Sequence, residues 1–127
     1  GKFNDPGPQN AWMEKYIFPG AYTPTLSEQF PSIERAKLFV TDVEILRLHY
    51  AETLKLWREA FEKKRETIAS MYDEKFCRMW EFYLAGCETA FRHGVLMVFQ
   101  IQLSKSLSTV PLTRDYISDF EKSHFEI

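Results

Sequence analysis

The feature that most constrains the fold is a pair of apolar stripes, one through residues 50–71 and one through residues 74–92. In both, large apolar side chains recur at helical spacing, so each segment is predicted to form an α-helix. The first stripe contains Tyr50, Leu54, Trp57, Phe61, Ile68 and Met71; the second contains Phe76, Met79, Trp80, Tyr83, Leu84, Cys87 and Phe91. Both faces must be buried on something broad, and we expect Trp57 and Trp80 to lie in the core.

The ends and outer faces of these helices follow from local signals. Asp73 is a helix-capping residue, and His93-Gly94 supplies a C-terminal stop. The face of the first helix opposite its stripe is predicted to be solvated. It carries Glu52, Lys55, Arg58, Glu59, Glu62, Lys63, Lys64, Arg65 and Glu66.

Shorter elements flank the two helices. Residues 38–46 and 95–103 are rich in β-branched and aromatic residues and partly alternate, so we predict strands. Helices are expected at about 10–18, capped by Asn10, and at about 26–35, where Thr25 and Glu28 form a capping box. Residues 104–127 form a polar tail in which Val110-Pro111-Leu112 is a candidate docked arm. Two strands cannot form a stable sheet alone, which suggests part of a larger α/β fold.

Composition excludes several classes of protein. The net charge of −2 gives no sign of a nucleic-acid surface or a polybasic anchor, so a membrane partner would be held by apolar contact. Aromatic residues make up 16% of the chain, which suggests a core, an interface or an apolar ligand cavity built from large side chains. No metal-ligand spacing, phosphate-binding loop or nucleophile motif is present.

The two cysteines and the lack of a hydrophobic span bear on the compartment. On one helix, Cys77 and Cys87 would lie about 15 Å apart, too far for a disulfide, and we expect buried thiols in a reducing compartment. The sequence has no apolar run long enough to span a membrane and no signal peptide at its start, so a cytoplasmic protein is expected.

Three sequence blocks resemble one family of lipid-modifying enzymes. Residues 15–20 (KYIFPG), with Pro24, are similar to the KYIFPGG-x-L-P-S signature of cyclopropane-fatty-acid synthases, with Ala21 and Thr25 in place of the usual Gly and Ser. Residues 49–57 (HYAETLKLW) resemble the HYAxTLxxW block. Residues 76–94 resemble F-x-RMWEFYLAxCE…FR-x-G, and Gln100 stands at the family's Gln in the last strand. The blocks follow the family's order and spacing.

The resemblance implies a fold and a reaction. Members are class I methyltransferases with a Rossmann-like, seven-stranded sheet, in which residues 38–46 and 95–103 would be the antiparallel edge pair. Residues 1–127 would then be a single C-terminal fragment, with S-adenosylmethionine bound mainly by a missing N-terminal half and no cofactor-binding residue in this chain. In the family, a cis double bond of a phospholipid acyl chain attacks the sulfonium methyl group. Bound bicarbonate then takes a proton, and a cyclopropane ring closes.

Site residues follow from matched positions. The family's bicarbonate-binding tyrosine corresponds to Tyr50, whose phenol can hydrogen-bond an anion in an apolar pocket. Phe18 and Tyr83 are candidates for lining the substrate pocket, although each also fits a structural role, Phe18 at a helix end and Tyr83 in the core. No metal site is expected.

Partners and alternatives complete the hypothesis. The resemblance implies an unsaturated phospholipid substrate at the membrane surface and a cytoplasmic enzyme peripheral to the inner membrane. We expect the fragment to be inactive alone, and to form homo-oligomers or associate with its N-terminal half because its apolar faces would be exposed. One alternative is a related methyltransferase with another acceptor, such as mycolic acid or an amine; the other is a non-catalytic helical interaction module.

Overall fold

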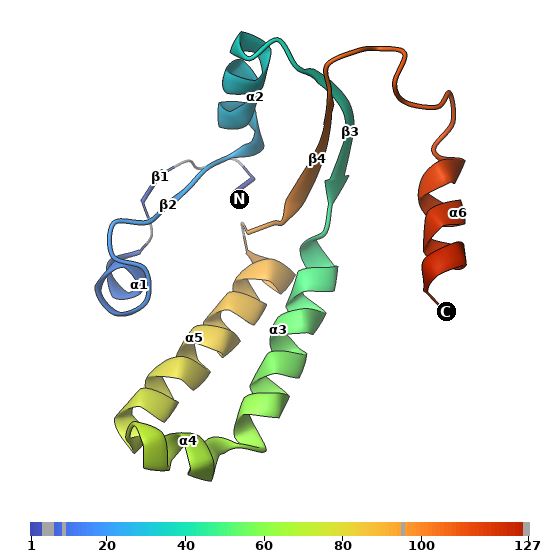
Figure 1. The fold of residues 1–127 in the computed structure, drawn as a ribbon. Coiled ribbons are helices and arrows are strands. Elements are labelled where there is room, and N and C mark those ends of the chain that lie inside the picture. Colours follow the sequence, from blue (N-terminus) through green and yellow to red (C-terminus); the bar gives the residue numbers. More distant parts are fainter. Residues whose placement is uncertain (4–6, 9, 95, 126–127) are drawn as a thin grey trace.

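The fold is built around a helical hairpin that carries a two-stranded sheet at its open end. The computed structural model describes residues 1–3, 7–8, 10–94 and 96–125. Helices α3 (Arg47–Glu62) and α5 (Glu74–His93) lie side by side and antiparallel, and α4 (Arg65–Met71) closes one end of the pair (Figure 1). Strands β3 (Phe39–Ile45) and β4 (Phe99–Ser104) extend from the other end.

The core lies between α3 and α5. On α5 the buried residues Cys77, Leu84 and Phe91 are seven positions apart, so they form one stripe along the helix. They pack with Ala51, Leu54 and Phe61 of α3. Burial of a leucine side chain contributes about 1.5–3 kcal/mol, which makes Leu54 and Leu84, each 1% exposed, leading contributors to the hairpin.

The strand pair is antiparallel. Val43 lies opposite Ile101 and Ile45 opposite Phe99, with an irregularity between Val40 and Asp42. Because β3 leads directly into α3 and β4 follows α5, pairing the strands holds this end of the hairpin together. The predicted strands at 38–46 and 95–103 correspond to these elements, with β4 beginning later; residue 95 lies outside the described residues.

The N-terminal elements lie in two places: the first helix lies against α5, and the second contacts β3. Helix α1 (Ala11–Tyr16) is capped by the Asn10 side chain, which accepts a hydrogen bond from the Met13 N–H. Strands β1 (Gly7–Pro8) and β2 (Tyr22–Thr23) pair in antiparallel fashion and were not predicted. Helix α2 (Leu26–Arg35) has the expected bounds and the expected capping box at Thr25.

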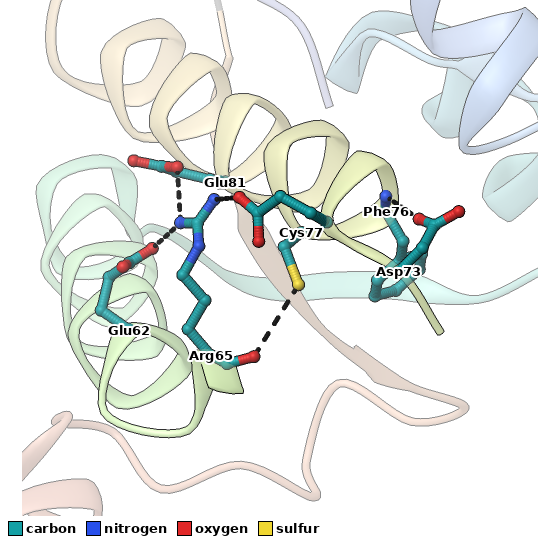
Figure 2. Close-up of polar contacts among 7 residues, drawn as sticks. Glu62, Arg65, Asp73, Phe76, Cys77 and Glu81 are labelled. Carbon is teal, nitrogen blue, oxygen red and sulfur yellow. Dashed lines mark hydrogen bonds and ion pairs between the residues drawn. The ribbon is translucent and has the colours of Figure 1, made fainter. Parts of the chain in front are cut away.

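The predicted continuous helix at 50–71 is wrong, because α3 ends at Glu62 and α4 starts at Arg65. The Arg65 guanidinium fixes this corner (Figure 2). It makes ion pairs of 2.7–2.9 Å with Glu62, Glu74 and Glu81, so one side chain ties the end of α3 to the first half of α5. After this turn, Ile68 of α4 packs against the core.

Two further expectations about the first helix fail. Its charged face is not wholly solvated, because Glu52, Arg58 and Arg65 form ion pairs with α5, and Glu62 pairs with Arg65. Trp57 is not a core residue: it is 51% exposed. Trp80, in contrast, is half-buried and packs against the core.

The tail is more ordered than predicted, because it contains the helix α6 (Asp115–His124). Arg114 pairs with Asp42 of β3 at 2.7 Å, and the Tyr116 hydroxyl donates to the Gln102 side chain of β4 at 2.9 Å. Val110 and Pro111 line a hollow against the same strands, whereas Leu112 is fully exposed. Of the three candidate arm residues, only Val110 is half-buried; Pro111 and Leu112 are exposed.

Cys77 and Cys87 are free thiols; Cys77 is buried and Cys87 is half-buried. In the part of the chain that the structure describes, no helix has the length and apolar character needed to cross a membrane.

Candidate active site

Tyr50 lies in the first turns of α3, against the C-terminal end of α5. Its ring contacts the edge of Phe91 at a centroid distance of 4.8 Å and that of Trp57 at 6.0 Å. These contacts hold the half-buried ring in place, because aromatic edge-to-face pairs add to the stability gained from burial. Among the described residues, the Tyr50 hydroxyl has no hydrogen-bond partner, which leaves its donor available to a ligand.

Tyr83 and Phe18 meet from different elements. Tyr83 lies in the middle of α5, and its ring is 5.9 Å from that of Phe18 in an edge-to-face arrangement. Phe18 follows α1 in a turn where Gly20 has a φ of 73°, a conformation that favours glycine. Phe18 remains 45% exposed, so one side of its ring is open to a further contact.

Burial and neighbours keep the Tyr83 phenol protonated. Burial raises the pKa of Tyr83 to about 12, with further upward contributions from Cys87 and from the Tyr50 phenol. Burial likewise raises the pKa of the Cys87 thiol. Tyr83 and Phe18 are in direct contact, whereas Tyr50 packs on Phe91, eight residues further along the same face of α5. We call Tyr50, Tyr83 and Phe18, with Cys87 and Phe91, the aromatic cluster.

A cavity of about 420 Å³ adjoins the cluster through Tyr83 and Cys87. Most of its lining is apolar. The lining residues are Lys2, Asn10, Trp12, Met13, Phe82, Tyr83, Gly86, Cys87, Ala90 and Leu96. Such a lining, with few polar groups, is typical of a site for an apolar ligand.

Comparison with known proteins decides the family. The model of the family described as mycolic acid cyclopropane synthetase matches residues 2–101. The chain belongs to this family. Tuberculostearic acid methyltransferase UfaA1 of Mycobacterium tuberculosis is 46% identical over 91 residues, covering 70% of this chain and 21% of that protein. A probable fatty acid methyltransferase of Pseudomonas putida is 41% identical over 108 residues, covering 82% of this chain and 27% of that protein.

Solved structures of cyclopropane synthases have the same local fold. The cyclopropane synthase MmaA2 from Mycobacterium tuberculosis superposes with a TM-score of 0.70 at 30% identity, covering 72% of this chain and 32% of that one. The mycolic acid cyclopropane synthase CmaA1, complexed with SAH and CTAB, gives a TM-score of 0.69 at 29% identity over the same shares. The predicted partial class I methyltransferase fold, mostly helical with an antiparallel strand pair, is therefore confirmed.

In this chain of the cyclopropane synthetase family, ion pairs hold the Tyr50 end of α3 against α5. Glu88, with a side chain only 13% exposed, pairs with Arg58 at 3.0 Å and with Arg92 at 2.9 Å. Arg92 also reaches Glu52, two residues after Tyr50, at 2.7 Å. Burial works to raise the pKa of Glu88, but the hydrogen bonds from Arg92 and Arg58 outweigh it and lower the pKa.

Sequence reasoning missed two contributors to this site. Cys87 and Phe91 were interpreted only as core residues, yet they touch Tyr83 and Tyr50. Helical spacing offered a signal, since Tyr83, Cys87 and Phe91 are four residues apart in turn and share one face of α5. Helical spacing could not predict the ion pairs Glu88–Arg58 and Glu52–Arg92, because each joins residues at least thirty positions apart.

Proposed function

We propose that this chain is the C-terminal part of an S-adenosylmethionine-dependent methyltransferase that acts on a cis double bond of an unsaturated phospholipid acyl chain and forms a cyclopropane ring. The observation that carries the proposal is a row of two aromatic pairs along one face of α5, Phe18 on Tyr83 and Tyr50 on Phe91, with the Cys87 thiol between Tyr83 and Phe91 in the sequence. Both curated relatives described above are named as methyltransferases of fatty acids. The chain matches only 21–27% of their length, so the remaining machinery would lie elsewhere in the whole protein.

The reaction places a positive charge beside these residues. The π electrons of the double bond form a bond to the methyl carbon, and the methyl–sulfur bond breaks with its electron pair left on sulfur. The acyl chain then carries a cation until the new methyl group loses a proton and the C–H electrons close the ring. An exposed aromatic face such as that of Phe18 would stabilise a cation, and an apolar lining would keep water from attacking it.

The proton acceptor proposed here is bicarbonate, and Tyr50 fits part of its site. The Tyr50 hydroxyl is a donor without a partner among the described residues, and its ring is fixed by Phe91 and Trp57. A phenol held in this way can donate one hydrogen bond to an anion. Bound bicarbonate would supply the base for the final proton loss, and residues outside this chain would provide its other contacts. Tyr83 does not compete as a base, because burial raises its pKa to about 12.

The substrate and cofactor parts of the proposal extend to the whole protein. S-adenosylmethionine would be bound mainly by the part of the protein that precedes this chain. The apolar lining of the 420 Å³ cavity fits an acyl segment of a phospholipid drawn from a membrane surface. As the family resemblance implies, the proposed enzyme is cytoplasmic and peripheral to the inner membrane.

A second product is supported by the names of the relatives. UfaA1 is named for tuberculostearic acid, and a relative from Komagataella phaffii that is 32% identical over 99 residues is a sphingolipid C9-methyltransferase. A methylene branch in place of a ring would form if a hydride shifted from the methyl-bearing carbon to the cationic carbon and the methyl group then lost a proton, with the C–H electrons forming a C=C bond. The aromatic cluster serves either product, because both pass through a cation on the acyl chain.

The experiment uses the whole protein with methyl-labelled S-adenosylmethionine and vesicles of unsaturated or saturated phospholipid. The proposal predicts label in the unsaturated acyl chains only, with a mass gain of one methylene. Mild hydrogenation then separates the products, because a methylene branch takes up hydrogen and a cyclopropane ring does not. Label in neither lipid, or in both equally, would contradict the proposed acceptor.

A further inference from the structure

The residues on either side of Ala51 hold α3 against α5 in two different ways. Ala51 is completely buried in the core that the two helices share, so it marks the line along which they meet. Successive residues of an α-helix lie about 100° apart around its axis, which puts Tyr50 and Glu52 on opposite flanks of this line. On one flank, the Tyr50 ring packs on Phe91. On the other flank, the Glu52 carboxylate pairs with Arg92, the residue after Phe91, at 2.7 Å.

The Arg92 guanidinium is itself held in one orientation. Its Nε donates to one oxygen of Glu88 at 2.9 Å, while its Nη2 binds Glu52. The other oxygen of Glu88 accepts a hydrogen bond from Arg58 Nη2 at 3.0 Å. Because a guanidinium is planar and its donors lie at fixed angles, two bound donors determine its orientation. The four side chains form a network of alternating charge, Glu52–Arg92–Glu88–Arg58, that crosses twice between α3 and α5.

Burial makes this network a poor source of stability. The Glu88 side chain is only 13% exposed, and the Nε atom of Arg58 is buried without a hydrogen-bond partner among the described residues. Taking such groups out of water costs free energy that their mutual attraction largely offsets but does not greatly exceed. The more exposed pair, Glu52–Arg92, contributes little to stability. What the network can provide is one fixed arrangement of the two helices.

The Tyr50 hydroxyl depends on this arrangement. A rotation of α3 about its own axis moves the hydroxyl farther than the backbone, because the hydroxyl lies at the outer end of a long side chain. The same rotation would separate Glu52 from Arg92, since Glu52 lies on the opposite flank of the same turn. The apolar contacts of Ala51 oppose rotation less, because hydrophobic contact has no preferred direction. A misplacement of about 1 Å at a reacting group can lower a rate about a hundredfold.

We propose that Arg92 is a positioning residue for Tyr50. Through Glu52 it fixes the rotation of α3, and thereby the place at which the Tyr50 hydroxyl meets an anion; Glu88 orients the Arg92 guanidinium. The consequence for the reaction rests on the proposed function, whereas the fixed position of the Tyr50 ring is tested without any substrate. Arg65 is a matched comparison. It also pairs with carboxylates of α3 and α5, but it lies at the end of the hairpin closed by α4, away from Tyr50 (Figure 1).

The first test follows the Tyr50 ring by fluorine NMR of the whole protein with fluorotyrosine in place of tyrosine. The Tyr50 signal is identified by its loss in Tyr50→Phe. Arg65→Gln should leave this signal as in wild type, whereas Arg92→Gln and Glu52→Gln should shift or broaden it. Glu52→Gln guards against a folding defect, because the Glu52 side chain is 57% exposed. Its control is Glu59→Gln, which removes an exposed carboxylate of α3 that makes no ion pair with any described residue.

Two results of this test would overturn the proposal: a Tyr50 signal unchanged in Arg92→Gln, or the same change in Arg65→Gln as in Arg92→Gln. Both are decided without methyl transfer.

The second test is a double-mutant cycle for methyl transfer by the whole protein. Arg92→Gln should transfer methyl groups between about tenfold and a hundredfold more slowly than wild type, and Arg65→Gln should stay near wild type. In a Tyr50→Phe background, Arg92→Gln should cause no further loss, because Arg92 acts through Tyr50. Losses that add in the double variant would overturn the proposal. A wild-type protein without methyl transfer would contradict the proposed function and not the positioning of Tyr50, which the fluorine signal decides.

Discussion

At the scale of single residues, Tyr50 and Tyr83 have different surroundings, which indicates different roles. The Tyr50 ring packs against the core and contacts the rings of Phe91 and Trp57, and its hydroxyl has no hydrogen-bond partner among the described residues. Tyr83 is held among Phe18, Trp80 and Cys87, and burial raises its pKa. We interpret Tyr50 as the residue that binds an anion through its hydroxyl, and Tyr83 as an uncharged residue that lines the site.

The raised pKa of Tyr83 predicts a specific loss of stability in alkali. Its folded-state pKa of about 12 lies above the ordinary value of 10.0, so folding favours the protonated phenol. That contribution is complete below pH 10 and is lost as the pH rises toward 12. In urea unfolding, wild type should therefore lose more stability than Tyr83→Phe between these two pH values.

Tyr72→Phe is the matched control for this titration, because it removes one phenol from an exposed position. The control should follow the wild-type pH dependence. If Tyr83→Phe and wild type lost stability in parallel across this interval, the phenol of Tyr83 would be freely ionisable and the cluster would be more open than described.

At the scale of elements, the α3–α5 hairpin carries both the core and the site. Its apolar seam contains Leu54 and Leu84, and ion pairs from Arg65, Arg58 and Arg92 border the seam. The charged pairs fix the corner and the rotation of the helices, whereas the seam supplies most of the stability, since partly exposed ion pairs contribute little.

A pair of leucines on α3 tests this division. Leu54 is 1% exposed and Leu56, two residues later, is 61% exposed. Leu54→Ala should destabilise the 127-residue chain by about 2–5 kcal/mol, because it removes buried methyl groups and leaves a cavity. Leu56→Ala should change stability by less than about 0.5 kcal/mol. Equal effects in denaturant titrations would show that the seam is placed incorrectly.

The sequence predicted those elements whose signals are local. The caps at Asn10, Thr25 and Asp73 are present as expected, since each depends on hydrogen bonds over three residues. The break after Glu62 escaped prediction, because Phe61 and Ile68 keep helical spacing across it. Its cause is the contact of Arg65 with Glu74 and Glu81, which exists only after α5 has packed.

Helix α6 and the site were predictable to different degrees. Nothing caps α6 by a side chain, so its start carried no local signal. The grouping of Tyr50, Tyr83 and Phe18 followed from family resemblance and not from spacing, because the three residues lie on separate elements. The structure brings Phe18 and Tyr83 into contact, whereas Tyr50 packs on Phe91, eight residues further along α5.

At the scale of the whole molecule, both long helices expose large apolar side chains. Those more than half exposed include Leu48, Leu56 and Trp57 of α3 and Phe82 of α5. Soluble monomers rarely expose contiguous apolar patches of this kind. In the whole protein, we expect other segments or a second copy to cover the α3 face.

This exposure predicts self-association of the isolated chain. The 127-residue chain should form dimers or larger species in multi-angle light scattering at micromolar concentration, and Leu56→Ser/Trp57→Ser should shift it toward the monomer by removing apolar contact area. Lys55→Ser is a neighbouring control that leaves the apolar surface intact. A wild-type chain that stays monomeric would contradict the expectation.

The most direct test of the central claim is the bicarbonate dependence of methyl transfer by the whole protein, with wild type compared with Tyr50→Phe. The control is Tyr116→Phe, which removes a phenol of α6 outside the residues matched by the family. The account predicts that Tyr50→Phe transfers methyl groups roughly a hundredfold more slowly and recovers in part at high bicarbonate, because one preorganised hydrogen-bond donor is lost. A Tyr50→Phe rate equal to wild type, with the same bicarbonate dependence, would contradict the role of Tyr50 and the site built around it.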